Sequence, residues 1–203
     1  MKTQTKITQE NITPVNALEL LKQGNSRFEE SLMTLRDLKA QVNDTKDGQF
    51  PFAAVLSCID SRVPAEMVFD QGIGDLFSVR VAGNIVNEDV LGSLEYSCKV
   101  AGSKIIVVLG HSKCGAVTAA CKGVELGNIT ALLDKIIPAE SVKGDGDALT
   151  DESIERVAHE NVKTSIDRIL KESPILCDMA DAKEIMIVGA MYDVSTGKVT
   201  FLN

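Results

Sequence analysis

Apolar residues along the chain form short continuous runs, and stretches with helical spacing separate these runs. Five runs have the length and composition of buried β-strands: residues 52–57, 76–81, 104–109, 185–191 and 198–202. The run at 104–109 (KIIVVL) is the clearest, because strands of parallel sheets are buried on both faces. Ser195-Thr196-Gly197 separates the last two runs, which predicts a β-hairpin at the end of the chain.

Helical spacing of apolar residues fills most of the remaining chain. It predicts a short helix that begins at Pro64 and ends at Gly72 and Gly74, and further helices over residues 88–100, 116–124 and 153–170, with a loop at 143–147. Asp151 and Ser153 are candidate caps of the longest helix. Strands that alternate with helices indicate an α/β fold with a mainly parallel sheet of about five strands, flanked by helices and closed by an antiparallel edge hairpin.

The N-terminal part has a different pattern. Residues 1–13 are polar and lack periodicity, so we interpret them as a loose arm. Pro14 predicts the start of a helix and Gly24 its end, a second helix is expected over residues 26–40, and residues 43–48 have turn composition. The 203 residues therefore form a single domain whose residues 1–40 are a helical arm.

Charge and cysteine content exclude several classes of protein. The chain has 21 Lys and Arg against 29 Asp and Glu, a net charge of −8, which argues against electrostatic binding of nucleic acid or of an anionic membrane. No apolar run is long enough to cross a bilayer, and the first ten residues do not resemble a signal peptide, so we expect a cytoplasmic protein. Five cysteines, an odd number, argue against a disulfide framework.

Two segments with reactive side chains directly follow predicted strands. One is Cys58-Ile59-Asp60-Ser61-Arg62, and the other is His111-Ser112-Lys113-Cys114-Gly115. Ligands of open parallel sheets bind beyond the carboxyl ends of the strands, so Cys58, His111 and Cys114 can meet if the strands are neighbours. Two thiolates and an imidazole suit Zn²⁺, and three ligands leave a position open, as in catalytic zinc sites.

The residues alone leave a second interpretation open, in which Cys58 and Cys114 are small core residues. Cys98 and Cys121 lie on apolar helical stripes, and we expect both in the core, whereas Cys177 has no assignment. Nucleotide binding is discounted, because the segment from Gly110 has the glycine spacing of a phosphate loop without its lysine. The spacing of Cys58 and Arg62 is also too short for the phosphate loop of a cysteine phosphatase.

The combined pattern resembles the β-class carbonic anhydrases. The resemblance rests on SCIDSRVPAEMVFDQGIGDLFSVRVAGNIV, SLEY and IIVVLGHSKCGAV, and it extends from about Ala17 to the end of the chain. It implies Zn²⁺ held by Cys58, His111 and Cys114, and reversible hydration of carbon dioxide to bicarbonate and a proton by attack of zinc-bound hydroxide. It also implies a gate, in which Asp60 is the fourth metal ligand in a closed form and pairs with Arg62 in an open form.

The resemblance further implies a substrate pocket and an assembly. Gln49, Phe77 and Tyr96 would line the pocket, partly from a neighbouring subunit, and Gly115 would allow a tight turn beside the metal. Each can instead be an ordinary loop, core or interface residue. The assembly would be a homodimer, or a tetramer, with the arm of residues 1–40 packed on a partner subunit. A carbonyl sulfide or carbon disulfide hydrolase with the same ligands, and a non-catalytic zinc- or bicarbonate-binding relative, are the alternatives.

Two further expectations concern regulation and proton transfer. Some bacterial members of the family carry an inhibitory bicarbonate pocket built around a tryptophan, and this chain has no Trp, so we expect that pocket to be absent. His159 is the single histidine outside the predicted ligand set. Because it lies on the polar side of its helix, we expect it to be solvated, with buffer or water carrying the proton away.

Overall fold

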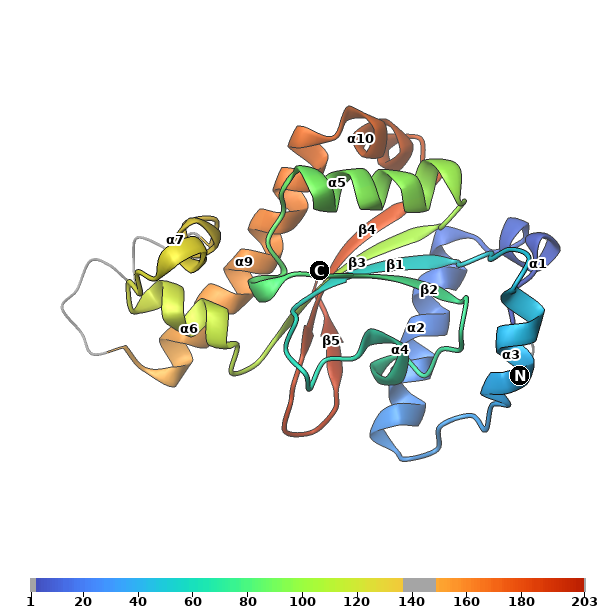
Figure 1. The fold of residues 1–203 in the computed structure, drawn as a ribbon, viewed down its shortest axis with the longest axis horizontal. Helices are drawn as coiled ribbons and strands as arrows, with labels where there is room; N and C mark the ends of the chain where they lie inside the picture. Colours follow the sequence, from blue (N-terminus) through green and yellow to red (C-terminus); the bar gives the residue numbers. More distant parts are fainter. Residues whose placement is uncertain (1–2, 137–148, 203) are drawn as a thin grey trace.

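Five strands form one sheet at the centre of the molecule (Figure 1). The computed structural model describes residues 3–136 and 149–202, so the loop predicted at residues 143–147 lies outside the described part. The order in the sheet is β2-β1-β3-β4-β5, with bounds Ala53–Ser57 (β1), Leu76–Arg80 (β2), Ile105–His111 (β3), Met186–Tyr192 (β4) and Val199–Phe201 (β5). The first four strands are parallel and β5 is antiparallel to β4, which confirms the predicted α/β fold and its edge hairpin.

The pairing register brings the carboxyl ends of the central strands together. Ser57, the last residue of β1, pairs with Arg80 of β2 and with Leu109 of β3. Strand β3 continues two residues further than the sequence predicted, so His111 is the last residue of this strand and pairs with Tyr192. Both chemically reactive segments therefore begin at the same edge of the sheet.

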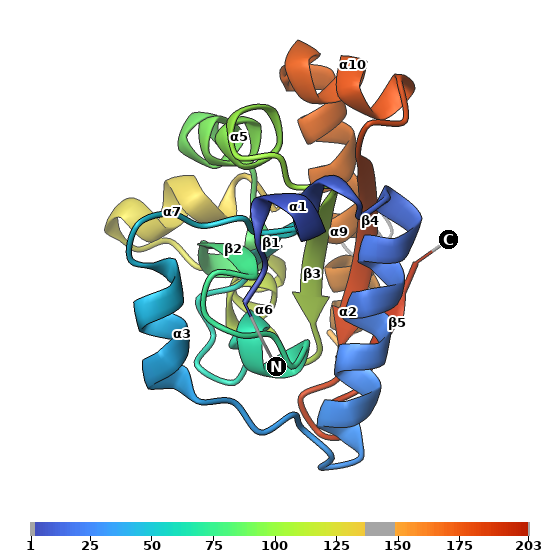
Figure 2. The same ribbon diagram turned by 90° about the vertical axis from the view of Figure 1, so that its right-hand side faces the viewer.

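Alternating side chains of the sheet face two separate apolar cores. Ala54 and Leu56 of β1 belong to the core covered by α5 (Glu88–Glu95), α6 (Gly115–Cys121), α7 (Gly127–Leu133), α9 (Asp151–Glu172) and α10 (Pro174–Asp181). Ala53 and Val55 belong to the core covered by α2 (Pro14–Glu29) and α4 (Ala65–Val68). Figure 2 views the molecule from the side on which α1, α2 and α3 lie. Burial on both faces explains why β1 and β3 are continuous apolar runs.

The prediction of a loose arm at residues 1–13 is wrong. These residues contain helix α1 (Lys6–Glu10), which Thr5 caps through a capping box. The side chain of Gln9 is buried, and its amide donates hydrogen bonds to the carbonyl oxygens of Pro51 and Ala101. A polar segment is thus held on the domain by a buried amide, which hydrophobic periodicity does not detect.

The predicted helix boundaries around Gly24 are also wrong. Helix α2 continues through Gly24 to Glu29, and the next helix, α3, covers Leu38–Thr45, so the helix expected over residues 26–40 is not found. The turn expected over residues 43–48 is present but begins later, at residue 46, after α3 ends. A Cβ atom at position 24 would lie 1.8 Å from the carbonyl oxygen of Phe69. Gly24 therefore permits close packing of α2 on the end of α4 and does not terminate a helix.

The remaining helices agree with the predicted ones in position and differ at their ends. Helix α9 covers the predicted stretch, but its N-cap is Thr150 and Ser153 completes the capping box three residues later, so neither predicted cap is the N-cap residue. Helix α4 ends earlier than predicted, at Val68, and α6 ends at Cys121. Beyond α5 the chain widens into a π-helical turn, η2 (Tyr96–Val100). No helix in the described part of the chain is both long and apolar enough to span a membrane.

Candidate metal centre

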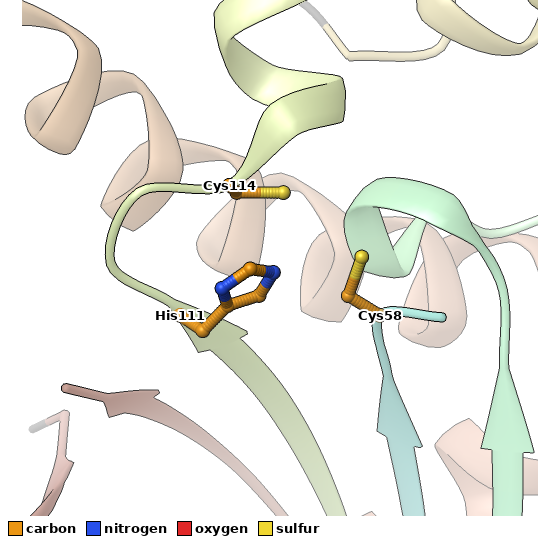
Figure 3. Close-up of side chains that lie close together, drawn as sticks. All are labelled: Cys58, His111 and Cys114. Atoms are coloured by element: carbon orange, nitrogen blue, oxygen red, sulfur yellow. The ribbon is translucent and has the colours of Figure 1, made fainter. Parts of the chain in front are cut away.

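Cys58, His111 and Cys114 converge at the carboxyl ends of β1 and β3 (Figure 3). Cys58 is the first residue after β1, His111 ends β3, and Cys114 is the N-cap residue of α6. One ligand atom from each side chain lies within 4.8 Å of the other two, and all three residues are buried. The sequence prediction that these residues meet at one point is therefore confirmed by the fold.

A tight turn carries the chain from His111 to Cys114. Lys113 adopts the left-handed conformation in this turn, with a φ of 54°. Gly115 is the first residue of α6, and a Cβ atom there would meet nothing within 4 Å. The sequence analysis expects Gly115 to allow this turn, but the residue with the left-handed backbone is Lys113. A contact of Gly115 with substrate stays a prediction.

The ring of His111 is oriented for metal binding. Its Nδ1 donates a hydrogen bond to the carbonyl oxygen of Ser112 at 2.9 Å, which fixes the tautomer and leaves a lone pair on Nε2. Nε2 is buried and has no hydrogen-bond partner among the residues that the structure describes. Leaving a buried polar atom without a hydrogen-bond partner costs about 1–3 kcal/mol, so a ligand bound to this nitrogen would stabilise the site. A metal ion held by the three side chains would bind this lone pair.

The thiol groups of Cys58 and Cys114 have pKa values shifted in opposite directions. A hydrogen bond from Cys114 is the main cause that lowers the pKa of Cys58 to about 4, with a smaller contribution from His111. The same hydrogen bond, together with burial, raises the pKa of Cys114. A metal ion held by both sulfurs would keep both as thiolates. Two sulfurs and one imidazole nitrogen within 4.8 Å of one another are a donor set that fits Zn²⁺.

Asp60 and Arg62 lie beside this cluster as an ion pair. The distance from Arg62 Nη2 to Asp60 Oδ2 is 2.7 Å, and Arg62 also donates to the carbonyl oxygen of Lys113 at 3.2 Å. The hydrogen bonds from Arg62 hold the pKa of Asp60 well below its usual range, so the carboxylate is ionised. The loop after β1 and the turn after β3 are therefore tied together by one guanidinium group.

Arg80 is a site residue that the sequence analysis missed. Its Nε donates to the carbonyl oxygen of Cys58 at 3.0 Å, and its Nη2 donates to that of Asp60 at 2.6 Å. Arg80 therefore braces the backbone of the loop that carries both residues. It reaches this loop because it ends β2 opposite Ser57, a strand pairing that no local sequence signal specifies.

The predicted substrate residues lie at the other end of the sheet. Gln49 precedes β1, and Phe77 pairs with Ala54 near the beginning of β2. The rings of Phe77 and Tyr96 meet edge to face with centroids 6.1 Å apart. Strand β1 separates this end from Cys58, and five residues of strand span about 16 Å. The fold therefore does not bring Gln49, Phe77 or Tyr96 to the metal centre of their own chain.

The other predicted residues lie outside the cluster. Cys98 is buried in the core, where burial raises the pKa of its thiol to about 11, and Cys121 packs at the edge of the same core, as expected. His159 is half-buried and lines a hollow of about 750 Å³ together with Ser112 and Lys113, behind the ligand-bearing turn. Its solvation stays a prediction.

An open, mainly parallel sheet with a Cys-His-Cys cluster at the carboxyl ends of its central strands defines an α/β protein with a candidate three-ligand metal centre. The model of the carbonic anhydrase family matches residues 53–199, a segment that contains every residue of this centre. The chain belongs to the carbonic anhydrases, and its fold is that of the β class.

Individual relatives agree with this assignment. Carbonic anhydrase 2 of Mycobacterium tuberculosis is 35% identical over 198 residues, which cover 93% of this chain and 92% of the relative. The β-carbonic anhydrase CafA of Aspergillus fumigatus has the same fold, with a TM-score of 0.75 at 23% identity over 93% of this chain and 90% of that one. A crystal structure described as one of two tetrameric β-carbonic anhydrases from Sordaria macrospora has a TM-score of 0.71 at 24% identity, over 81% of this chain and 90% of that one.

Proposed function

We propose that this protein catalyses the reversible hydration of carbon dioxide to bicarbonate and a proton, with Zn²⁺ held by Cys58, His111 and Cys114. The observation that carries the proposal is the convergence of these three side chains around a buried, unpartnered Nε2. Membership of the carbonic anhydrase family supports the same reaction. Zinc in this position would supply an acidified water that can attack carbon dioxide near neutral pH.

Asp60 would orient the nucleophile and also control access to the metal. Its carboxylate is ionised and held by Arg62, and in this arrangement it can accept a hydrogen bond from water beside the cluster. If the carboxylate left Arg62, it would be close enough in sequence to Cys58 to become the fourth ligand. The planar guanidinium of Arg62 would therefore decide between the two positions of Asp60.

A second copy of the chain would complete the substrate pocket. Gln49, Phe77 and Tyr96 lie too far from their own metal centre to serve it, and Tyr96 is 54% exposed. A partner that places this end of its sheet against the metal centre of the first copy would add its own Gln49, Phe77 and Tyr96 to that site. Apolar side chains that the chain leaves exposed around α3 would be covered in such an assembly: Leu32, Leu35, Leu38 and Val42.

The arm of residues 1–40 would have two functions in this assembly. Helix α2 buries Ala17 and Leu21 on its own sheet, and the connection to α3 would pack on the partner subunit. A tetramer of two such dimers is consistent with the structural neighbour described as tetrameric. The cytoplasmic location stays a prediction.

Stopped-flow measurement of carbon dioxide hydration, with the zinc content of the same sample, tests the proposal. We expect about one Zn²⁺ per chain and a hydration rate that is lost with the metal and recovers on its return. Zinc-loaded protein that hydrolyses carbonyl sulfide or carbon disulfide without hydrating carbon dioxide would support the hydrolase alternative. Zinc-loaded protein without activity on any of the three substrates would support the non-catalytic one, and either result would overturn the proposal.

A further inference from the structure

Helix α9 buries two polar side chains in the apolar face that packs on the sheet. Asn161 is 2% exposed and Ser165 is 3% exposed, and they are four residues apart on one side of the helix. Their neighbours on this face, Val157, Val162 and Ile169, are core residues. Polar side chains in such a position destabilise the fold unless they form hydrogen bonds, so their partners are informative.

Both side chains bind the same short segment, the helical turn η1 (Ala82–Asn84). Asn161 Nδ2 donates to the carbonyl oxygen of Gly83 at 2.7 Å, and Ser165 Oγ donates to that of Asn84 at 3.1 Å. On its other side, the backbone N–H of Gly83 donates to Cys58 Sγ at 3.3 Å. A continuous path of contacts therefore leads from α9 through η1 to a predicted metal ligand.

The segment η1 needs this support because its conformation is unfavourable. Gly83 and Asn84 both have left-handed backbones, with φ values of 67° and 43°. This conformation is uncommon for a residue other than glycine and persists when the surroundings fix it. The two hydrogen bonds from α9 are the side-chain hydrogen bonds that the structure shows to this segment, beside the backbone bond from the N–H of Asn84 to the carbonyl oxygen of Val81.

The position of α9 is itself fixed by close packing on the sheet. A Cβ atom at Gly110 of β3 would lie 2.6 Å from Val162 Cγ2, and one at Gly189 of β4 would lie 2.8 Å from Val162 Cγ1. Val162 is thus seated in a groove that only glycines allow. Because Asn161 is adjacent to Val162, the packing of Val162 on the sheet determines how closely the Asn161 amide approaches Gly83.

We propose that Asn161, assisted by Ser165, is a positioning residue that holds η1 so that the N–H of Gly83 points at the sulfur of Cys58. The inference rests on the proposed zinc site. A hydrogen bond to a coordinating thiolate orients it and withdraws electron density from it, and outer partners of this kind tune metal affinity and acidity. The effect is important here, because two thiolates would otherwise neutralise the charge of the metal ion.

The test compares Asn161→Leu, which keeps the size of the side chain and removes the donor, with Ile169→Ala, a buried core position on the same helix. Zinc affinity is measured by chelator competition, and the sulfur-to-metal charge-transfer band is measured in the Co²⁺-substituted protein. We expect Asn161→Leu to weaken zinc binding about 10–100-fold and to shift the band to lower energy, because the thiolate becomes richer in electrons. Ile169→Ala should lower the thermal unfolding midpoint and leave both metal readouts at wild-type values.

Wild-type affinity and an unshifted band in Asn161→Leu would overturn the proposal, and so would equal changes in Ile169→Ala, which would trace the effect to lost stability. If Asn161→Leu does not fold, Ser165→Ala replaces it, with smaller changes in the same direction expected and unchanged readouts counting against the proposal. Neither measurement depends on catalysis. If the wild-type protein did not hydrate carbon dioxide, the proposed function would be overturned, but the role of Asn161 in zinc binding could still be tested by these two measurements.

Discussion

Asp60 accepts three hydrogen bonds from Arg62, two residues further along the chain. The backbone N–H and Nε of Arg62 both donate to Oδ1 at 2.9 Å, and Nη2 donates to Oδ2 at 2.7 Å. Both carboxylate oxygens are thus engaged by one planar group. Asp60 follows Cys58 by two residues, and in the proposed gate a movement of its side chain would decide whether the carboxylate faces the arginine or the metal.

Replacement of Asp60 by alanine should separate metal binding from catalysis. We expect Asp60→Ala to keep its zinc and to lose about 10²–10⁴-fold in the hydration rate, because the nucleophile loses its acceptor. Ser61→Ala, an exposed position in the same loop, is the control and should behave as wild type in both measurements. The hydration rate is measured by stopped flow and the zinc content by metal analysis in both variants. An unchanged hydration rate in Asp60→Ala would show that this residue has no part in the mechanism.

Replacement of Cys114 by serine should remove the metal. Serine keeps the shape of the side chain but does not provide a thiolate, so the loss of zinc affinity should exceed the about 10–100-fold loss typical of outer-shell changes. Cys121→Ser, seven residues further on and half-buried, is the matched control and should retain a full complement of zinc. Chelator competition on both variants provides the comparison, and equal zinc affinities would contradict the ligand assignment.

The sequence predicted those parts of the structure that local patterns specify. The apolar run of β3 and the spacing of Cys58, His111 and Cys114 predicted the sheet and the cluster, and the fold agrees. The contribution of Arg80 depends on strand register, which is set by packing between distant segments and not by local sequence. The buried amide of Asn161 was missed for a related reason, since a polar residue in an apolar stripe does not reveal its partner.

Gly24 shows how tertiary packing overrides local preference, and it leads to a prediction about stability. In an isolated helix, alanine is favoured over glycine by about 1 kcal/mol. Gly24→Ala should nevertheless destabilise the protein, because the added carbon would lie 1.8 Å from the carbonyl oxygen of Phe69. Gly92→Ala in α5, where a Cβ atom meets nothing within 4 Å, should stabilise it by about 0.5–1 kcal/mol. Urea unfolding of both variants tests the difference in sign.

The buried carboxylate of Asp70 should stabilise the fold at neutral pH. Its side chain is fully buried and accepts hydrogen bonds from Arg27, Thr34 and Arg36, which ties α2 and the connection to α3 onto the end of α4. Burial alone would raise the pKa of Asp70, but the hydrogen bonds from Arg36 and Arg27 outweigh it and the pKa is lowered. Asp70→Asn leaves both arginines without their counter-charge, and we expect it to lower the free energy of unfolding by about 3–5 kcal/mol.

The sign of the pH dependence follows from the lowered pKa of Asp70. The stabilisation is fully present above the pKa of an unfolded aspartate, about 3.9, and is lost as the pH falls through the folded value. The difference between wild type and Asp70→Asn should therefore be largest near neutral pH and shrink below about pH 4. Asp44→Asn, an exposed position on α3, is the control with little effect at either pH. A difference that grows on acidification would contradict the proposed role of the charge.

A mixture of two inactive variants tests whether the active site is shared between subunits. Gln49 precedes β1 and Cys114 follows β3, so within one chain they lie at opposite ends of the sheet. Gln49→Ala keeps the metal and should lose activity, and Cys114→Ser loses the metal. If each site combines a metal centre of one subunit with Gln49 of the partner, a mixed dimer contains one site with both defects and one intact site. Equal amounts of the two variants, unfolded and refolded together, should then recover about a quarter of the wild-type rate. If each chain used its own Gln49, no mixed dimer would contain an intact site, and the mixture would be no more active than the separately refolded variants.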